Sequence, residues 1–255
     1  TQIRYAFRTL NRNRLYAAVS IFTLALGIGA STVIFSAVDA ILLRPLPYRQ
    51  DGQMVYIFLR DVAHGNDRMP LSVPELHDYR QQSQTTDGIA AYFEGLFNIT
   101  TQGQPEQIDG SRVTVNLLPL LGMKPVLGRN FLPEEEFPSR QGGVVILSHS
   151  LWTRRFNANP DILNQAVTMN GLTYRVVGVM SPDFYFPNRE TELWVPLWMV
   201  NSKNAFRSNR QLHVIGRLKP DVTLPQAQTE MATIAARLEQ SYNENKGMGA
   251  TAVSL

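Results

Sequence analysis

Two glycines spaced by one residue, Gly27 and Gly29, are the first residues along the chain that could do chemistry. Glycines with this spacing occur in phosphate-binding loops, where the backbone must come close to the ligand. A dinucleotide-binding loop needs a third glycine at the position of Thr32, and a P-loop needs a lysine, whereas the first lysine here is Lys124. We therefore expect no nucleotide, and no other cofactor, at these glycines.

The other polar groups also lack the spacing that catalysis or metal binding requires. Asp61, His64 and Asp67 could surround a metal ion, but the chain has neither an HxH nor an HExxH pair, and a solvated loop explains them. Ser148-His149-Ser150 lacks the GxSxG and SxxK patterns of serine hydrolases, so we interpret Ser148 as a helix cap. Glu134 to Glu136 is interpreted as a solvated acidic loop. We expect no catalytic residue and no metal ligand.

Composition and charge exclude further classes of protein. The 255 residues are 44% hydrophobic and 18% charged, which is typical of a chain with a packed core. The absence of cysteine excludes disulfides, thiolate zinc sites and thiol catalysis. The formal net charge of +3 arises entirely from residues 1–43, so residues 44–255 are neutral and offer no electrostatic footprint for nucleic acid.

An uncharged stretch from Leu15 to Val38 predicts a transmembrane helix over residues 15–43. Residues 1–14 precede it as an amphipathic segment suited to the cytoplasmic membrane surface. By the positive-inside rule, the arginines of this segment keep the N-terminus in the cytoplasm, and residues after about 44 are exported. These topology anchors are Arg4, Arg8, Arg12 and Arg14.

Within the predicted membrane helix, small residues recur four positions apart, as in helices that pack closely in membranes. The pairs are Ala25 with Gly29 and Gly27 with Ser31. Two alternatives stay open at this point: a plain anchor with incidental glycines, and a cleaved signal peptide, although the apolar run is longer than the apolar region of signal peptides.

The exported part alternates strands and helices. We expect strands over residues 53–60, 88–101, 106–115, 142–148 and 212–219, and a hairpin at Asn170-Gly171. Capping boxes at Ser72 and Thr223 predict helices, the second with a buried stripe formed by Ala227, Met231, Ile234 and Leu238. All three tryptophans fall between residues 122 and 204, which predicts a small core of its own for that block.

Three stretches together resemble the membrane-anchored periplasmic core of MacB/FtsX-type ABC transporter permeases. They are residues 3–48 (IRYAFRTLNRNR…LLRPLPY), residues 113–135 (VTVNLLPLLGMKPVLGRNFLPEE) with the following GGVVILSHSLWTRRF and VTMNGLTYRVVGVM, and residues 214–238 (VIGRLKPDVTLPQAQTEMATIAARL). The resemblance covers essentially the whole chain, and the first stretch is most similar to duplicated orphan permeases that lack a fused ATPase.

The resemblance implies an α+β fold: one N-terminal transmembrane helix, then a periplasmic domain in which a porter-like α/β subdomain holds an inserted, smaller β-rich subdomain. On this chain the porter-like subdomain corresponds to residues 44–121 and 205–255, and the insertion to residues 122–204. Later transmembrane helices of the family are missing, so we expect the chain to be a fragment of a longer permease.

The resemblance also implies a non-catalytic protein of the bacterial inner membrane, with residues after about 44 in the periplasm. Its implied partners are the membrane, a second permease unit in a homodimer or pseudo-dimer, a separate cytoplasmic ABC ATPase and a periplasmic adaptor. ATP hydrolysis would drive efflux or mechanical signalling across the membrane. The alternative is a membrane-anchored periplasmic binding or sensor module without an ATPase, and the sequence does not identify the cargo.

Overall fold

The computed structural model describes residues 14–38, 52–61, 63–101, 103–136, 143–198 and 205–255. The chain divides into two compact units, residues 1–46 and residues 47–255, and each is described by itself. Three of the four arginines expected to set the membrane topology, Arg4, Arg8 and Arg12, lie outside the described residues.

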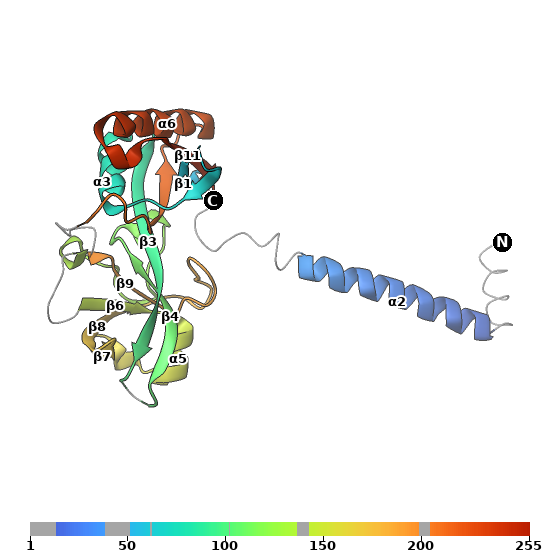
Figure 1. Ribbon diagram of the computed structural model, residues 1–255. Helices are drawn as coiled ribbons and strands as arrows, with labels where there is room; N and C mark the ends of the chain where they lie inside the picture. The colour runs from blue at the N-terminus through green and yellow to red at the C-terminus, as the bar shows by residue number, and fades with distance from the viewer. Residues whose placement is uncertain (1–13, 39–51, 62, 102, 137–142, 199–204) are drawn as a thin grey trace. The chain divides into compact units, whose positions relative to one another are not determined.

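In the first unit the structure describes one helix, α2 (Arg14–Val38), of 25 residues (Figure 1). The hydroxyls of Thr23 and Thr32 each donate to a carbonyl one turn earlier, at 2.8 Å, so the helix satisfies these polar groups itself. Among the residues described, no helix qualifies as a membrane span by length and apolar character together. The membrane helix expected over residues 15–43 therefore stays a prediction. Large apolar side chains of α2 are exposed: Leu15, Val19, Ile21, Phe22, Leu24, Leu26, Ile28, Val33 and Phe35.

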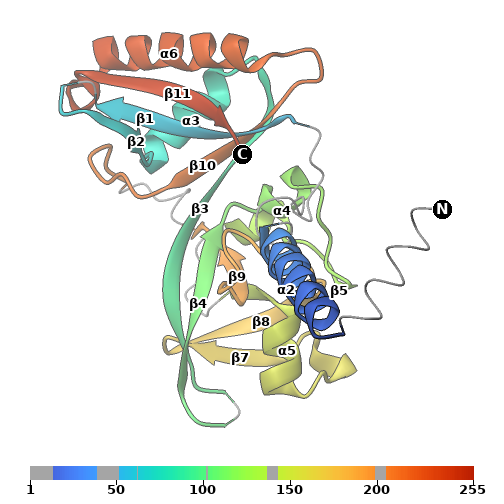
Figure 2. The ribbon, with the colours of Figure 1, turned by 90° about the vertical axis from the view of Figure 1, so that its right-hand side faces the viewer.

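The second unit is built on one 11-stranded sheet with the order β11-β1-β10-β3-β4-β9-β6-β8-β5 (Figure 2). Off this path, β2 pairs with β1, and β7 pairs with β3 and β8. The pairs β4–β9 and β6–β8 are parallel and the other pairs are antiparallel. The strands are β1 (Met54–Asp61), β2 (Asn66–Met69), β3 (Thr86–Ile99), β4 (Glu106–Val113), β5 (Leu127–Gly128), β6 (Gly143–Leu147), β7 (Ala166–Met169), β8 (Leu172–Val179), β9 (Leu193–Pro196), β10 (His213–Leu218) and β11 (Met248–Ser254).

The helices of this unit begin where the sequence places caps. The backbone N–H of Ser72 donates to Glu75 Oε2 at 2.8 Å, which completes a capping box at the start of α3. The backbone N–H of Thr223 donates to the Gln226 side chain at the start of α6, also at 2.8 Å. The predicted stripe of α6 is buried, as expected. The helices are α3 (Val73–Gln82), α4 (Leu117–Leu120), α5 (His149–Phe156) and α6 (Leu224–Ser241), with 3-10 turns η2 (Pro133–Glu136), η3 (Pro160–Ile162) and η5 (Asn243–Asn245).

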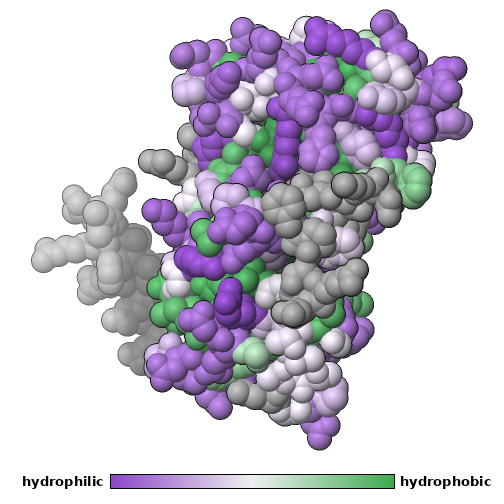
Figure 3. Space-filling model, turned by 90° about the vertical axis from the view of Figure 1, so that its left-hand side faces the viewer, coloured by the Kyte–Doolittle hydropathy of each residue, from purple (hydrophilic) through white to green (hydrophobic). Residues whose placement is uncertain are grey.

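Many of the buried apolar residues of the second unit gather in an upper core and a lower core. The upper core packs α3 and α6 against β1, β10 and β11, with Ile57, Leu76 and Met231 among its members. The lower core lies beside α5 and includes Val145 and Val176. On the face shown in Figure 3, the end that carries α3 and α6 is covered mainly by hydrophilic residues, so these helices bury their apolar sides inward.

The long strand β3 belongs to both cores, because Ile89 and Ala91 lie in the upper one and Phe97 and Ile99 in the lower one. The sequence predicts a core formed by residues 122–204 alone. The lower core differs from this, because it also contains residues of β3 and β4. The three tryptophans also differ in their surroundings: Trp152 packs against the lower core and Trp194 is fully buried, whereas Trp198 is 46% exposed.

Candidate functional surfaces

The two ends of the second unit lie beside each other. Strand β11 pairs antiparallel with β1 in a register that places Ser254 opposite Val55. The backbone N–H of Leu255 donates to the carbonyl of Met54 at 2.9 Å. The first and last strands of this unit therefore pair with each other, and Met54 and Leu255 are neighbours across that pairing.

The segment 205–212, which we call the strap, runs across α3 and is held by two arginines. Arg210 donates to both carboxylate oxygens of Glu75, at 2.8 Å from Nη2 to Oε1, and to the carbonyl of Glu244 at 2.8 Å. The Glu75 side chain is completely buried and also accepts a hydrogen bond from Asn245 at 2.7 Å. Nothing in the sequence indicates that Glu75 and Arg210 are partners, because they lie 135 positions apart.

The other arginine of the strap is Arg207, which contacts α3 one turn further along. Its Nη2 donates to Asp78 at 2.6 Å, and its guanidinium carbon lies 3.3 Å from the centre of the Tyr242 ring. Both arginines therefore join α3 to the segment between α6 and β11. The contacted residues on α3, Glu75 and Asp78, are three positions apart and so lie on one helix face.

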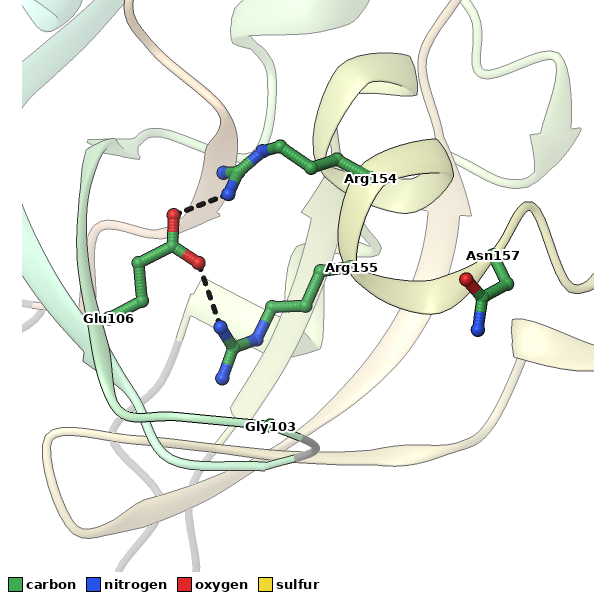
Figure 4. A pocket seen from close by; sticks show the side chains of 5 residues that line it. All are labelled: Gly103, Glu106, Arg154, Arg155 and Asn157. Carbon is green, nitrogen blue, oxygen red and sulfur yellow. Dashed lines mark hydrogen bonds and ion pairs between the residues drawn. The ribbon is translucent and has the colours of Figure 1, made fainter.

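A second charged cluster surrounds an open pocket of about 420 Å³ near the turn between β3 and β4 (Figure 4). Arg155 comes from the last turn of α5 and donates to Glu106 at 2.7 Å and to the carbonyls of Thr101 and Gln104. Arg154 donates to Glu106 and, at 2.7 Å, to Glu192. The lining residues are Gly103, Glu106, Arg154, Arg155 and Asn157.

The charges of this cluster compensate one another, which argues for a structural role. Hydrogen bonds from Arg154 and Arg155 lower the pKa of the Glu106 carboxyl, and the hydrogen bond to Glu106 raises the pKa of Arg154. Two arginines face two glutamates here, so the pocket has no excess positive charge for an anion. Arg155, whose side chain is only 8% exposed, fixes the β3–β4 turn.

The residues considered for metal binding and hydrolysis have ordinary structural partners. His64 Nδ1 lies 2.8 Å from Asp61 on an exposed turn, while Asp67 pairs with Arg60 instead. Within the described ranges, no group of three or more potential metal ligands is present. The hydroxyl of Ser148 accepts from the backbone N–H of Leu151 at 3.0 Å, which confirms its predicted role as the cap of α5.

The prediction of a solvated acidic loop at residues 134–136 is wrong for two of its three carboxylates. Glu135 forms two hydrogen bonds to Arg129 and accepts one from the backbone N–H of Leu132. Glu136 accepts from the backbone N–H of Val115 at 3.1 Å. Only Glu134 is exposed. The carboxylates are part of the fold because the chain returns here to the end of β4, which the local sequence does not indicate.

The small residues expected to mediate helix packing all lie on α2 and are exposed: Ala25, Gly27, Gly29 and Ser31. A methyl group built on Gly27 or Gly29 would meet no atom within 4 Å. Arg14 is the first residue of the same helix. The structure thus offers an unobstructed surface at these positions, and their role in packing stays a prediction.

Solved structures of other proteins share this fold, among them three regions of permeases and transporters. The periplasmic region of MacB from Actinobacillus actinomycetemcomitans matches with a TM-score of 0.58 and 15% identity, over 79% of this chain and 88% of that one. A domain of a permease protein from Porphyromonas gingivalis matches with a TM-score of 0.60 and 10% identity, over 82% of this chain and 93% of that one. The extracellular domain of the noncanonic ABC-type transporter YknZ from Gram-positive bacteria matches with a TM-score of 0.57 and 12% identity, over 79% of this chain and 100% of that one.

No curated protein matches the amino-acid sequence. The model of the family described as MacB-like periplasmic core domain, however, matches residues 17–234, which is most of the chain, and this match includes α2 as well as the sheet. The chain therefore belongs to the MacB-like periplasmic core domain family, which is found in MacB/FtsX-type ABC transporter permeases.

Proposed function

We propose that this chain is the N-terminal, periplasm-exposing part of an ABC transporter permease that couples a separate cytoplasmic ATPase to efflux or mechanical signalling. The observation that carries the proposal is the family match over residues 17–234, together with a fold shared with three regions of permeases and transporters. In the described residues, the charged clusters serve the fold rather than a reaction. The chain itself is accordingly proposed to be non-catalytic.

The proposal includes a membrane helix over residues 15–43, with the N-terminus in the cytoplasm. It is supported by the sequence from Leu15 to Val38, which carries no charge, and by the four arginines up to Arg14. Reporters fused after Arg14 and after Pro47 test it. We expect a cytoplasmic signal from the first fusion and a periplasmic signal from the second, and a cytoplasmic signal from both would refute the topology.

We assign the small residues of α2 to contacts with another membrane helix, in the same permease unit or in the second unit of a dimer. Replacing Gly27 and Gly29 by leucine puts large side chains in the place of the exposed small residues. We expect the double variant to lose assembly, measured by cross-linking in membranes, while residues 47–255 keep their circular dichroism spectrum. Replacing the exposed Leu24 and Val33 by alanine provides a control that leaves the four small residues unchanged.

Mechanical coupling is supported by the hydrogen-bonded neighbours Met54 and Leu255. A force on the segment before β1 is therefore transmitted to the end of β11, at the edge of the sheet, because these two strands are paired. The sheet connects this edge to the lower core through β3, so the unit can move as one lever. We propose that residues 44–121 and 205–255 form its porter-like part, with residues 122–204 inserted.

Purification from membranes tests the partners of the full-length gene product. We expect an ABC ATPase to co-purify with it, in a complex that contains two permease units, and a periplasmic adaptor to be recovered after cross-linking. Recovery of a periplasmic ligand or signalling partner without any ATPase would instead favour a membrane-anchored binding or sensor module.

A further inference from the structure

The strap, residues 205–212, is held differently along its length. Its second half has backbone pairing, because the N–H groups of Gln211 and Leu212 both donate to the carbonyl of Leu71, at 3.1 and 2.9 Å, and Leu71 donates back to Leu212. In the first half the described backbone bonds are local: the N–H of Asn209 donates to the carbonyl of Phe206, and the N–H of Arg210 donates to the carbonyl of Ser208, both at 3.1 Å. Ala205 reaches the rim of the upper core, but Phe206 is 71% exposed.

The two arginines of the strap also differ in how deeply their partner carboxylates are buried. Arg210 compensates the charge of Glu75, which is completely buried and serves at the same time as the capping-box partner of Ser72. If Arg210 left, a buried carboxylate would lose its main cation at the first turn of α3. Removing one member of a buried ion pair is strongly destabilising. The second half of the strap therefore cannot open without disturbing α3.

Arg207 makes a contact that can open without leaving a buried charge behind. Its partner Asp78 is 19% exposed, and Tyr242 is 39% exposed, so water reaches both once the first half of the strap moves away. In the closed state, Nη1 of Arg207 is buried and has no hydrogen-bond partner among the described residues. Opening would hydrate this group, which lowers the cost of release.

We propose that the strap is a two-part device: residues 210–212 form a permanent anchor, and residues 205–209 form a releasable latch that closes through Arg207. Release exposes Asp78 and Tyr242 and frees Phe206 to move, while β10 keeps its register because Arg210 stays bound. The device is a property of the fold and does not require that the chain act in a permease.

Hydrogen exchange of the full chain in detergent micelles, read by mass spectrometry, tests this proposal. In the unmodified protein we expect amides of residues 205–209 to exchange at least about tenfold faster than those of Gln211 and Leu212, which are bonded to Leu71. Uniform exchange over the whole strap would overturn the proposal, whatever the variants show.

A matched pair of variants, Arg207→Lys and Arg210→Lys, keeps the charge and removes the guanidinium contacts. We expect Arg207→Lys to raise exchange only in residues 205–209. Arg210→Lys is expected to raise exchange in residues 210–212 and also in the first turn of α3. Faster exchange in α3 caused by Arg207→Lys would contradict the assignment of latch and anchor.

Discussion

Glu230, on α6, offers a sharp test of how the upper core is assembled. Its carboxylate accepts hydrogen bonds from Ser83 Oγ at 2.8 Å, from the backbone N–H groups of Gln84 and Thr85 at 2.7 and 3.1 Å, and from the Thr85 hydroxyl. These groups follow the end of α3, so one carboxylate connects α6 to the turn between α3 and β3.

The change to make is Glu230→Gln, which keeps the size of the side chain. The amide replaces one acceptor oxygen by an NH₂ group, which then faces donors, and it removes the charge that strengthens the remaining bonds. Hydrogen bonds to charged groups contribute about 1.5–3 kcal/mol each, but Glu230 is only partly buried. We therefore expect the free energy of unfolding to fall by about 2 kcal/mol in total.

Urea unfolding of a fragment with residues 47–255, followed by tryptophan fluorescence, measures this loss. The matched control is Glu239→Gln, on the same helix, where an exposed carboxylate accepts one hydrogen bond, from the backbone N–H of Gly247 at 2.9 Å. The remaining amide oxygen can keep that single bond, so we expect a change within about 0.5 kcal/mol. Equal effects of the two substitutions would refute the assignment of the Glu230 hydrogen bonds.

The effect of pH gives an independent check of the same group. Burial raises the pKa of Glu230, but the hydrogen bonds from Thr85, Gln84 and Ser83 lower it more, so that the net shift is downward from 4.5. A pKa that is lower in the folded state stabilises the protein above the unfolded value and ceases to do so as the pH falls through the folded value. The stability difference from the variant should therefore be constant above pH 5.5 or so and shrink below 4.5. A difference that stays unchanged in acid would contradict this reasoning.

Two further predictions use matched pairs in the same unfolding assay. Gly128→Ala should lower the free energy of unfolding by at least about 3 kcal/mol, because φ is +82° and the new methyl would collide with the carbonyl oxygen of Val177 in β8. Its control, Gly103→Ala, has a similar φ of +80° but open space around it, so it should lower that free energy by only about 1–2 kcal/mol. Arg155→Ala should lower the free energy of unfolding by about 2–3 kcal/mol, because the Arg155 side chain is nearly buried. Arg154→Ala should lower it by about 0–1 kcal/mol, because the Arg154 side chain is 47% exposed. Equal losses within either pair would show that the close contact or the burial is not decisive.

Local features of the fold could be predicted because their causes are close in sequence. The capping box at Ser72, the cap at Ser148 and the hairpin at Asn170-Gly171 all appear as expected. In the hairpin both turn residues have positive φ, of 52° and 76°, which asparagine and glycine tolerate best. The stripe of α6 was also correct, since a helical period of apolar residues predicts which face is buried.

The features that depend on distant residues could not be predicted in this way. Phe97, Ile99 and Ile108 of the lower core come from outside the tryptophan-rich block, because β3 pairs with β7 and β4 pairs with β9. The sequence predicts only a capping role for Glu75, because its second partner, Arg210, lies far away along the chain. Glu136 likewise has the sequence context of a surface charge, but it accepts a hydrogen bond from the backbone of Val115, 21 positions earlier.

The hydrogen bond between Leu255 and Met54 also bears on how much the order of elements along the chain matters. A short linker would join these positions and close the unit into a ring without disturbing the sheet. Such a ring could be reopened at the exposed β1–β2 turn around Gly65, where the backbone already adopts a φ of +70°. A circularly permuted version of residues 52–255 should therefore reach the same native state, with β1 last rather than first. In this sense the unit is defined by its contacts and not by the point at which its chain begins.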